Sequence, residues 1–224
     1  MPTEPLLSDP SVALAVAEVE ALEWGISQQF FAVHRPVLVA GRPHVAGVVS
    51  AAEPDALFVF FAVQDESYHF WVRVEPRSHG PQIAFVGYCP QYHVSFDVSS
   101  DSVTPDEITA HIGLSPTEVR TKGSSRLPGA RPFPRHLWTF EALAGQPGLL
   151  EDKLTHLFRV LGERQPRIST LAADCSAEVS VVSHQWQAWP EGFHLSPEYL
   201  ARLHDLRASF DLDLYVGGPL EAAT

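Results

Sequence analysis

The stretch that decides the fold runs GFHLSPEYLARLHDLRASFDLDLY over residues 192–215. Ser196 followed by Pro197 is a helix start, because serine caps a first turn well and proline fits its first position. Leucines at helical spacing, Leu200 among them, follow this start. From residue 210 apolar and acidic residues alternate, which is typical of a half-buried strand. The sequence therefore predicts a helix and then a strand, with Leu200 and Leu214 facing the core.

The residues before this stretch continue the same alternation of strands and helices. Thr104-Pro105-Asp106-Glu107 supplies an N-cap, a first-turn proline and a capping-box glutamate for a short helix that ends at Gly113. The other predicted elements are strands over 92–99, 137–142, 177–186 and 210–216 and a long helix over 150–162. This order favours a ferredoxin-like α+β module with helices on one face of a small sheet.

The first ninety residues have a different pattern. Asp9-Pro10 starts an amphipathic helix that Gly25 is expected to end. From Ile26 to Tyr88, runs rich in valine and aromatic residues are divided by polar turns, which predicts an antiparallel β-meander. We therefore expect an α+β protein of two modules, residues 1–90 and 91–224.

The second module also resembles a known family. The residues that carry the likeness are Val94-Ser95-Phe96-Asp97, the helix start at 104–109, the Lys122-Gly123 loop, the Trp138 strand, Gly192 to Ser196 and Leu212 to Tyr215. Over about residues 91–217 they are similar to the bacterial domain of unknown function 4279. The family carries no established activity, so the likeness implies a fold and boundaries rather than a chemistry.

Charge and composition narrow the function classes. The net charge of −12 disfavours general attraction to nucleic acid or anionic lipid and suits a basic protein partner. The two cysteines, Cys89 and Cys175, are too few for a disulfide framework. No apolar run approaches the roughly 20 residues that span a bilayer. The sequence predicts a cytoplasmic protein with no membrane contact.

One loop concentrates the basic residues and is the first candidate ligand site. It contains Arg120, Lys122, Arg126, Arg131 and Arg135, interspersed with glycine and serine. Guanidinium groups and backbone amides in such a loop could bind phosphate or carboxylate. The alternative is a solvated loop whose arginines pair with the acidic remainder of the protein. The sequence leaves both interpretations open.

The second candidate site joins His194 to Asp211 and Asp213. His194 precedes the Ser196 cap, and the two aspartates share one face of the last predicted strand. Together they could contact a ligand or exchange protons. In the alternative interpretation, His194 orders the turn and the aspartates solvate the outer face of the sheet.

The motifs of common catalytic and cofactor sites are missing from the sequence. No zinc-binding spacing of histidines or cysteines, phosphate-binding loop, dinucleotide fingerprint or serine-nucleophile motif occurs. We therefore predict no metal and no cofactor. The favoured hypothesis is a non-enzymatic protein-interaction module, of the immunity or adaptor type, for a basic partner. The alternative is a protein, or an enzyme, that binds an anionic small ligand or nucleotide through the loop from Arg120 to Arg135.

Overall fold

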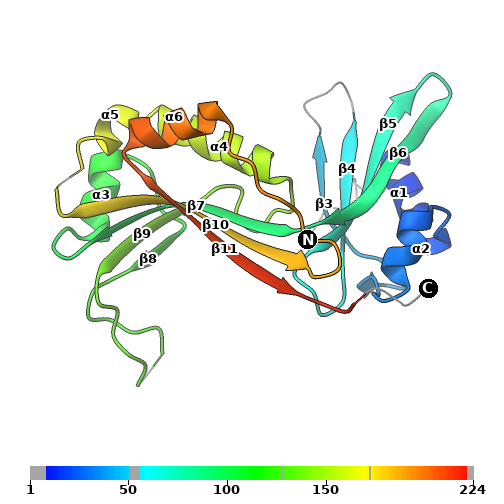
Figure 1. The fold of residues 1–224 in the computed structure, drawn as a ribbon, viewed down its shortest axis with the longest axis horizontal. Coiled ribbons are helices and arrows are strands. Elements are labelled where there is room, and N and C mark those ends of the chain that lie inside the picture. Colours follow the sequence, from blue (N-terminus) through cyan, green and yellow to red (C-terminus); the bar gives the residue numbers. More distant parts are fainter. Residues whose placement is uncertain (1–8, 51–55, 128, 172, 221–224) are drawn as a thin grey trace.

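The structure, a computed structural model, describes residues 9–50, 56–127, 129–171 and 173–220. Two sheets lie end to end along the long axis of the molecule, and the helices gather beside them in two groups (Figure 1). One sheet is antiparallel and the other is mixed. The predicted α+β class is confirmed.

The N-terminal sheet and its helices are formed by residues 10–89. The elements are α1 (Pro10–Ala21), α2 (Gly25–Phe31), β1 (Leu38–Val39), β2 (Arg42–Pro43), β3 (Val45–Ser50), β4 (Leu57–Ala62), β5 (His69–Arg77) and β6 (Gly80–Cys89). Strands β3 to β6 pair in chain order as the antiparallel meander that the sequence predicts. β1 and β2 form a separate two-stranded ribbon.

One face of this sheet is covered by α1 and α2. Asp9 caps α1 by accepting a hydrogen bond from the Ser11 amide at 2.7 Å, which satisfies a first-turn donor. The apolar stripe of α1 then packs on the sheet, where alternate residues of β5 such as Phe70 and Val72 are fully buried. Alternate residues of β5 therefore face the helices.

The expectation that Gly25 ends the first helix is wrong. The helix ends at Ala21, because Leu22 adopts a left-handed conformation with φ of 53°, and Gly25 instead begins α2. The buried carboxylate of Glu18 stabilises the turn between α1 and α2. It accepts hydrogen bonds from the Trp24 amide at 3.1 Å and the Ser27 hydroxyl at 2.5 Å, and so holds the start of α2 against α1.

The C-terminal part of the chain forms the second sheet and its helices. Its elements are β7 (Gln91–Ser100), α3 (Pro105–Ile112), β8 (Glu118–Arg120), β9 (His136–Glu141), α4 (Leu150–Gly162), α5 (Gln165–Ile168), β10 (Cys175–Trp186), α6 (Pro197–Leu206) and β11 (Ser209–Gly217). The strand order is β11-β10-β7-β9-β8, with β10 and β11 parallel and the other neighbours antiparallel. The succession from β7 to β10 is the ferredoxin-like βαββαβ unit, to which α6 and β11 add one more strand.

The helices of this part cover a single face of the five-stranded sheet (Figure 1). The capping box predicted for α3 is present, with Thr104 and Glu107 exchanging hydrogen bonds, and Gly113 ends the helix with φ of 73°. Ser196 caps α6 by accepting a hydrogen bond from the Tyr199 amide at 3.3 Å. The core between helices and sheet contains Phe96, Trp138 and the apolar stripe of α4.

Two leucines of the deciding stretch lie outside this core, contrary to prediction. The side chains of Leu200 on α6 and Leu214 on β11 are each 53% exposed, whereas Leu203 and Leu206 are buried. The reason is geometric. The helix layer extends only as far as Leu212, which is partly buried, and β11 continues past it at the edge of the sheet.

The two sheets share side chains where they meet. Trp186, at the end of β10, is fully buried in the N-terminal core, where its ring contacts Phe30, His34 and Tyr88. On the other face of the N-terminal sheet, Cys89 is 2% exposed, with its Sγ 3.9 Å from the Gly148 carbonyl oxygen. Burial raises the pKa of the Cys89 thiol.

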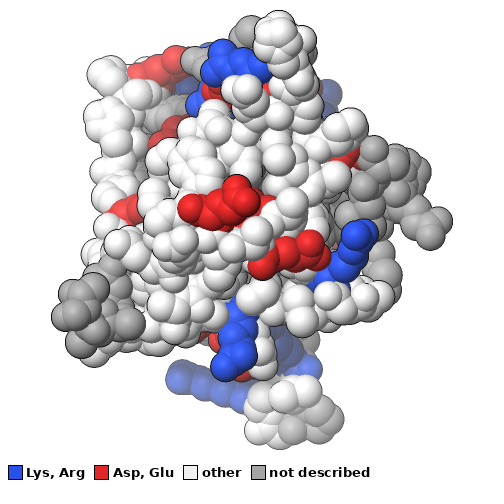
Figure 2. Space-filling model, turned by 90° about the vertical axis from the view of Figure 1, so that its right-hand side faces the viewer, with Lys and Arg blue, Asp and Glu red and all other residues white. Residues whose placement is uncertain are grey.

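The end of the molecule formed by the N-terminal sheet and its helices carries few charges. Figure 2 shows mostly uncharged residues there, with acidic groups near the centre of the view and basic groups toward its margins. In the described ranges of the chain, no helix has the length and apolar character needed to cross a bilayer.

Candidate functional site

The face of the five-stranded sheet opposite its helices is the candidate functional site, and we call it the open face. Register and burial assign its residues, because the alternate residues Val94, Phe96, Val179 and Val181 are buried under the helices. The remaining positions carry Glu118, Arg120, Leu137, Thr139, Glu141, Gln91, His93, Ser95, Asp97, Ser99, Ser176, Glu178, Ser180, Val182, His184, Ser209, Asp211, Asp213 and Tyr215. The N-terminal core covers only the end of this face, where Trp186 enters it.

The open face is acidic. Each of its five strands contributes at least one carboxylate: Glu118 on β8, Glu141 on β9, Asp97 on β7, Glu178 on β10, and Asp211 and Asp213 on β11. The arginine assigned to this face is Arg120, which lies on the edge strand β8. A surface of this composition attracts cationic groups and repels phosphate.

Two of the carboxylates are direct neighbours across antiparallel strands, since Asp97 pairs in register with Glu178. Like charges in this arrangement destabilise a sheet. Hydroxyl groups partly compensate: Asp97 accepts hydrogen bonds from Thr139 at 2.5 Å and Ser95 at 2.9 Å, and Glu178 accepts one from Ser209 at 3.0 Å. Burial still raises the pKa of Asp97. A cation bound over this pair would relieve the repulsion.

Histidines lie beside the carboxylates at the end of the open face nearest the N-terminal sheet. The His93 Nδ1 and Glu141 Oε1 atoms are 2.7 Å apart, and this hydrogen bond lowers the pKa of Glu141. The ring of His184 meets that of His93 edge to face at 6.1 Å and stacks on Tyr215 at 5.0 Å. Burial, and then the neighbouring His93, lowers the pKa of His184.

The open face has no metal centre among the residues that the structure describes, where no group of three or more potential ligands comes together. Its chemistry is that of carboxylates, hydroxyls and imidazoles that accept or donate hydrogen bonds. The His93–Glu141 pair lacks an adjacent nucleophilic side chain among its hydrogen-bond partners in this part of the chain. The carboxylates of the face are groups that bind cations.

The arginine-rich loop lies between β8 and β9 and its cations contact the protein's own carboxylates. The Arg120 Nε and Arg126 Nη2 atoms lie 2.8 Å and 3.0 Å from the Glu118 Oε1 atom, and the Arg120 guanidinium also stands 5.5 Å from the Phe133 ring centre. These contacts lower the pKa of Glu118. Arg131 is exposed to solvent.

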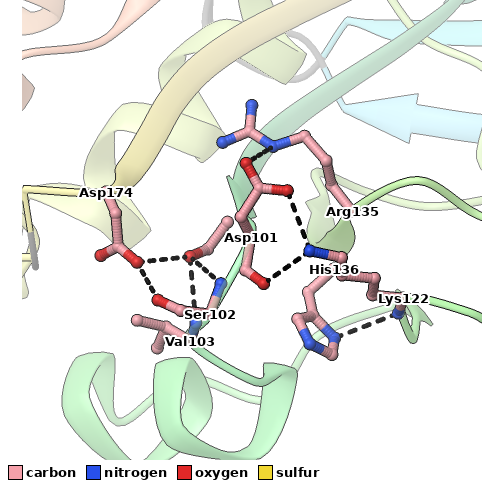
Figure 3. Close-up of polar contacts among 8 residues, drawn as sticks. Asp101, Ser102, Val103, Lys122, Arg135, His136 and Asp174 are labelled. Atoms are coloured by element: carbon pink, nitrogen blue, oxygen red, sulfur yellow. Dashed lines mark hydrogen bonds and ion pairs between the residues drawn. The ribbon is translucent and has the colours of Figure 1, made fainter.

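Asp101, which follows the end of β7, is the second anchor of the loop (Figure 3). Its Oδ1 atom is 3.3 Å from the Lys122 Nζ, and its Oδ2 atom is 3.3 Å from the Arg135 Nε. Lys122 also donates to the Asp101 carbonyl at 3.1 Å. These pairs are half exposed, so each contributes little stability, but an anion would have to displace Glu118 and Asp101 before it could use the loop.

The other predicted site residues are not brought together. His194 lies on the helix side, in a groove of about 710 Å³ between α4 and α6 that Ser196 and Tyr199 also line. Asp211 and Asp213 are exposed on the open face, on the other side of the sheet. Arg120 is on the open face too, but β8 and β11 are its opposite edges.

The residues that sequence analysis did not single out are Asp97, Glu141, Glu178, His93 and His184. The signal for four of them, all but Glu141, is the polar half of the alternation in residues 91–100 and 175–186, to which His93, Asp97, Glu178 and His184 belong. The alternation shows which side of each strand is polar. It does not reveal that β7 and β10 are neighbours, and this pairing is what brings Asp97 and Glu178 together.

Comparisons with known proteins place this site in a family. Neither the curated proteins nor the solved structures gave a match. The family described as a domain of unknown function (DUF4279) matches residues 90–217, which is more than half of the chain and contains every strand of the open face. The resemblance noted in the sequence is confirmed: the chain belongs to the DUF4279 family.

Proposed function

We propose that the chain is a non-enzymatic cytoplasmic interaction module, of the immunity or adaptor type, that binds a basic protein through the open face. The observation that carries the proposal is the presence of a carboxylate from every strand on the face of the sheet opposite its helices. The net charge of −12 supports it, since acidic surfaces accelerate encounters with basic partners. The repulsion between Asp97 and Glu178 supports it further, because a bound cation would convert a destabilising pair into a binding contact.

The alternative, an anion-binding loop, has weaker support. Arg120 and Arg126 pair with Glu118, and Lys122 and Arg135 pair with Asp101. An anionic ligand would have to replace these internal partners. The ion pairs favour the interpretation in which the loop is held to the sheet by its own charges.

A charge-matched pair of variants tests the proposal. Glu178→Gln, Asp211→Asn and Asp213→Asn together remove three carboxylates from the open face, whereas Glu163→Gln, Glu198→Gln and Asp205→Asn remove the same charge from exposed positions on the helix layer. Partners are captured from the native host at low salt with the unaltered protein, and the affinity of each recovered partner is then measured by calorimetry.

We expect the open-face variant to bind about tenfold more weakly, because three exposed charge contacts contribute a few tenths of a kcal/mol to one kcal/mol each. The helix-layer variant should bind almost normally, and added salt should weaken the unaltered complex. Equal losses in both variants would mean that only net charge matters, and recovery of no stoichiometric partner at low salt would remove the basis of the proposal.

A further inference from the structure

Among the residues that the structure describes, β11 leaves one edge of the five-stranded sheet unpaired. Within these residues it pairs with β10 on one side only and is the terminal strand of the sheet order. Its second half is exposed on both faces, with Leu214, Tyr215 and Val216 at 53%, 56% and 53% of their full accessibility. An exposed apolar edge of this kind is a template for pairing with another strand.

The direction of the backbone groups on β11 follows from one hydrogen bond. The Gly217 carbonyl accepts from the Gln187 amide at 2.8 Å, so the backbone of Gly217 faces the β10 side. Backbone groups of successive strand residues alternate in direction. Residues 211, 213 and 215 therefore bond toward β10, whereas the amides and carbonyls of Leu212, Leu214 and Val216 point to the free edge.

Only a few antiparallel registers with a second β11 are compatible with the charges. A two-fold axis at residue 212 or 213 would set Asp211 or Asp213 opposite another aspartate, which is unfavourable. An axis at Leu214 sets Asp213 opposite Tyr215 and Asp211 opposite Gly217 of the second copy. It also aligns the apolar residues, with Leu214 opposite itself and Leu212 opposite Val216, and uses every outward-pointing backbone group of these residues. An axis at Tyr215 would also separate the aspartates, but the strand ends at Gly217 and fewer residues would pair.

We propose that β11 pairs antiparallel with β11 of a second copy of this chain, about a two-fold axis at Leu214. The pairing closes the free edge of each sheet, joins the two five-stranded sheets into one and brings the half-exposed side chains of Leu214 and Val216 into contact across the axis. A two-fold interface of this kind is isologous, so one strand provides both halves of it. The pairing rests on the edge of β11 and is independent of what the open face binds.

Disulfide trapping tests the register directly. In a hydrogen-bonded antiparallel pair the Cα atoms are about 5.5 Å apart, which suits a disulfide. Leu214→Cys places two thiols across the axis at this spacing, whereas Leu212→Cys and Val216→Cys place equivalent thiols on the same edge but about four residues apart along the strand. All three variants keep the native Cys89 and Cys175.

We expect Leu214→Cys to form a covalent dimer under mild oxidation at least several-fold faster than the other two variants or the unaltered protein. Equal rates in all three variants, or faster trapping of Leu212→Cys or Val216→Cys, would overturn the proposed register.

Sedimentation equilibrium tests the association itself. The unaltered chain should associate to twice its mass of 24.7 kDa as its concentration rises. Leu214→Glu sets two carboxylates against each other at the axis and should raise the dimer dissociation constant at least tenfold. Leu200→Glu, which replaces an equally exposed leucine on α6, is the matched control and should leave the constant unchanged. A monomer at every concentration, or an intact dimer in Leu214→Glu, would overturn the proposal.

Discussion

His69 is a residue whose burial links the stability of the protein to pH. It lies on β5 with its ring near Phe60, and it faces the ammonium group of Lys153 from α4. Burial, and then the positive charge of Lys153, lowers the pKa of His69 from 6.5 to about 4. The folded protein therefore binds fewer protons at this site than the unfolded chain does between these values.

The free energy of unfolding should consequently fall as the pH drops from 6.5 to about 4. The shift in the His69 pKa corresponds to about 3 kcal/mol over this window, and the stabilisation is regained as the pH rises above it. His69→Gln should reduce the loss between neutral pH and about pH 4.5 by about that amount in urea melts. The control, His79→Gln at an exposed turn, should keep the full loss. An unchanged loss in His69→Gln would show that other groups carry it.

Two leucines on α6 allow the contribution of a buried side chain to the free energy of unfolding to be compared with that of an exposed one. Leu203 on α6 is 6% exposed and packs in the core, whereas Leu200 is 53% exposed. Leu203→Ala should cost about 2–5 kcal/mol of unfolding free energy through the lost contacts and the cavity. Leu200→Ala, the same change one turn earlier, should cost less than about 0.5 kcal/mol. Equal effects in chemical denaturation would contradict the position of α6 on the sheet.

At the scale of elements, one carboxylate attaches the loop between β8 and β9 to the end of β7. Asp101 accepts contacts from both Lys122 and Arg135. Asp101→Asn should increase hydrogen exchange of the backbone amides in residues 121–135 several-fold, because the loop loses its attachment to the end of β7. Global stability should change by less than about 1 kcal/mol, since these ion pairs are half exposed.

Glu163→Gln provides the control for this loop experiment, because it removes an exposed charge from the end of α4. It should leave exchange in residues 121–135 unchanged. Unaltered exchange in Asp101→Asn would mean that the loop is held by its Glu118 contacts alone.

The elements that the sequence predicts well are those whose signals are local. The Asp9 cap, the Thr104–Glu107 capping box and the Ser196 cap each depend on residues within one turn. The start of α2 could not be predicted this way, because it depends on Glu18 reaching across a corner to Trp24 and Ser27. The exposure of Leu214 depends on how far the helix layer extends, which no neighbouring residue encodes.

The candidate site follows the same division. The acidic face of β11 was visible in the alternation of Asp211 and Asp213, but the larger part of the open face depends on strand order. Asp97 and Glu178 are far apart in the chain and become neighbours only because β7 pairs with β10. The sequence leaves open whether the loop cations pair with the protein's own carboxylates, because Asp101 lies more than fifteen residues from Lys122 and Arg135 and meets them only through the fold.

At the scale of the whole molecule, Trp186 couples the two sheets. It belongs to β10 but is buried among Phe30, His34 and Tyr88, and its indole nitrogen donates to the Pro219 carbonyl at 2.5 Å. Because β10 ends inside the N-terminal core, neither core can unfold without losing the contacts of Trp186. Calorimetry of the unaltered chain should therefore show a single unfolding transition.

Trp186→Ala should separate that transition into two, with the N-terminal core losing about 3–5 kcal/mol. Trp138→Ala is the comparison, because Trp138 is equally buried but lies wholly within the C-terminal core. Trp138→Ala should lower the stability of the protein but keep a single transition, because the contacts of Trp186 with the N-terminal core remain. A single lowered transition in Trp186→Ala would mean that the sheets are joined by contacts other than this side chain.

The buried thiol of Cys89 makes the junction between the two sheets observable without any added probe. Its Sγ atom lies against the Gly148 carbonyl, in the segment that leads into α4, and is shielded from solvent on all sides. A thiol-modifying reagent reaches it only when this segment lifts away, and burial also keeps the sulfur in its unreactive protonated form. Cys175 is partly accessible and reacts without such an opening. We expect the slow phase of labelling to report how often this segment lifts away from Cys89.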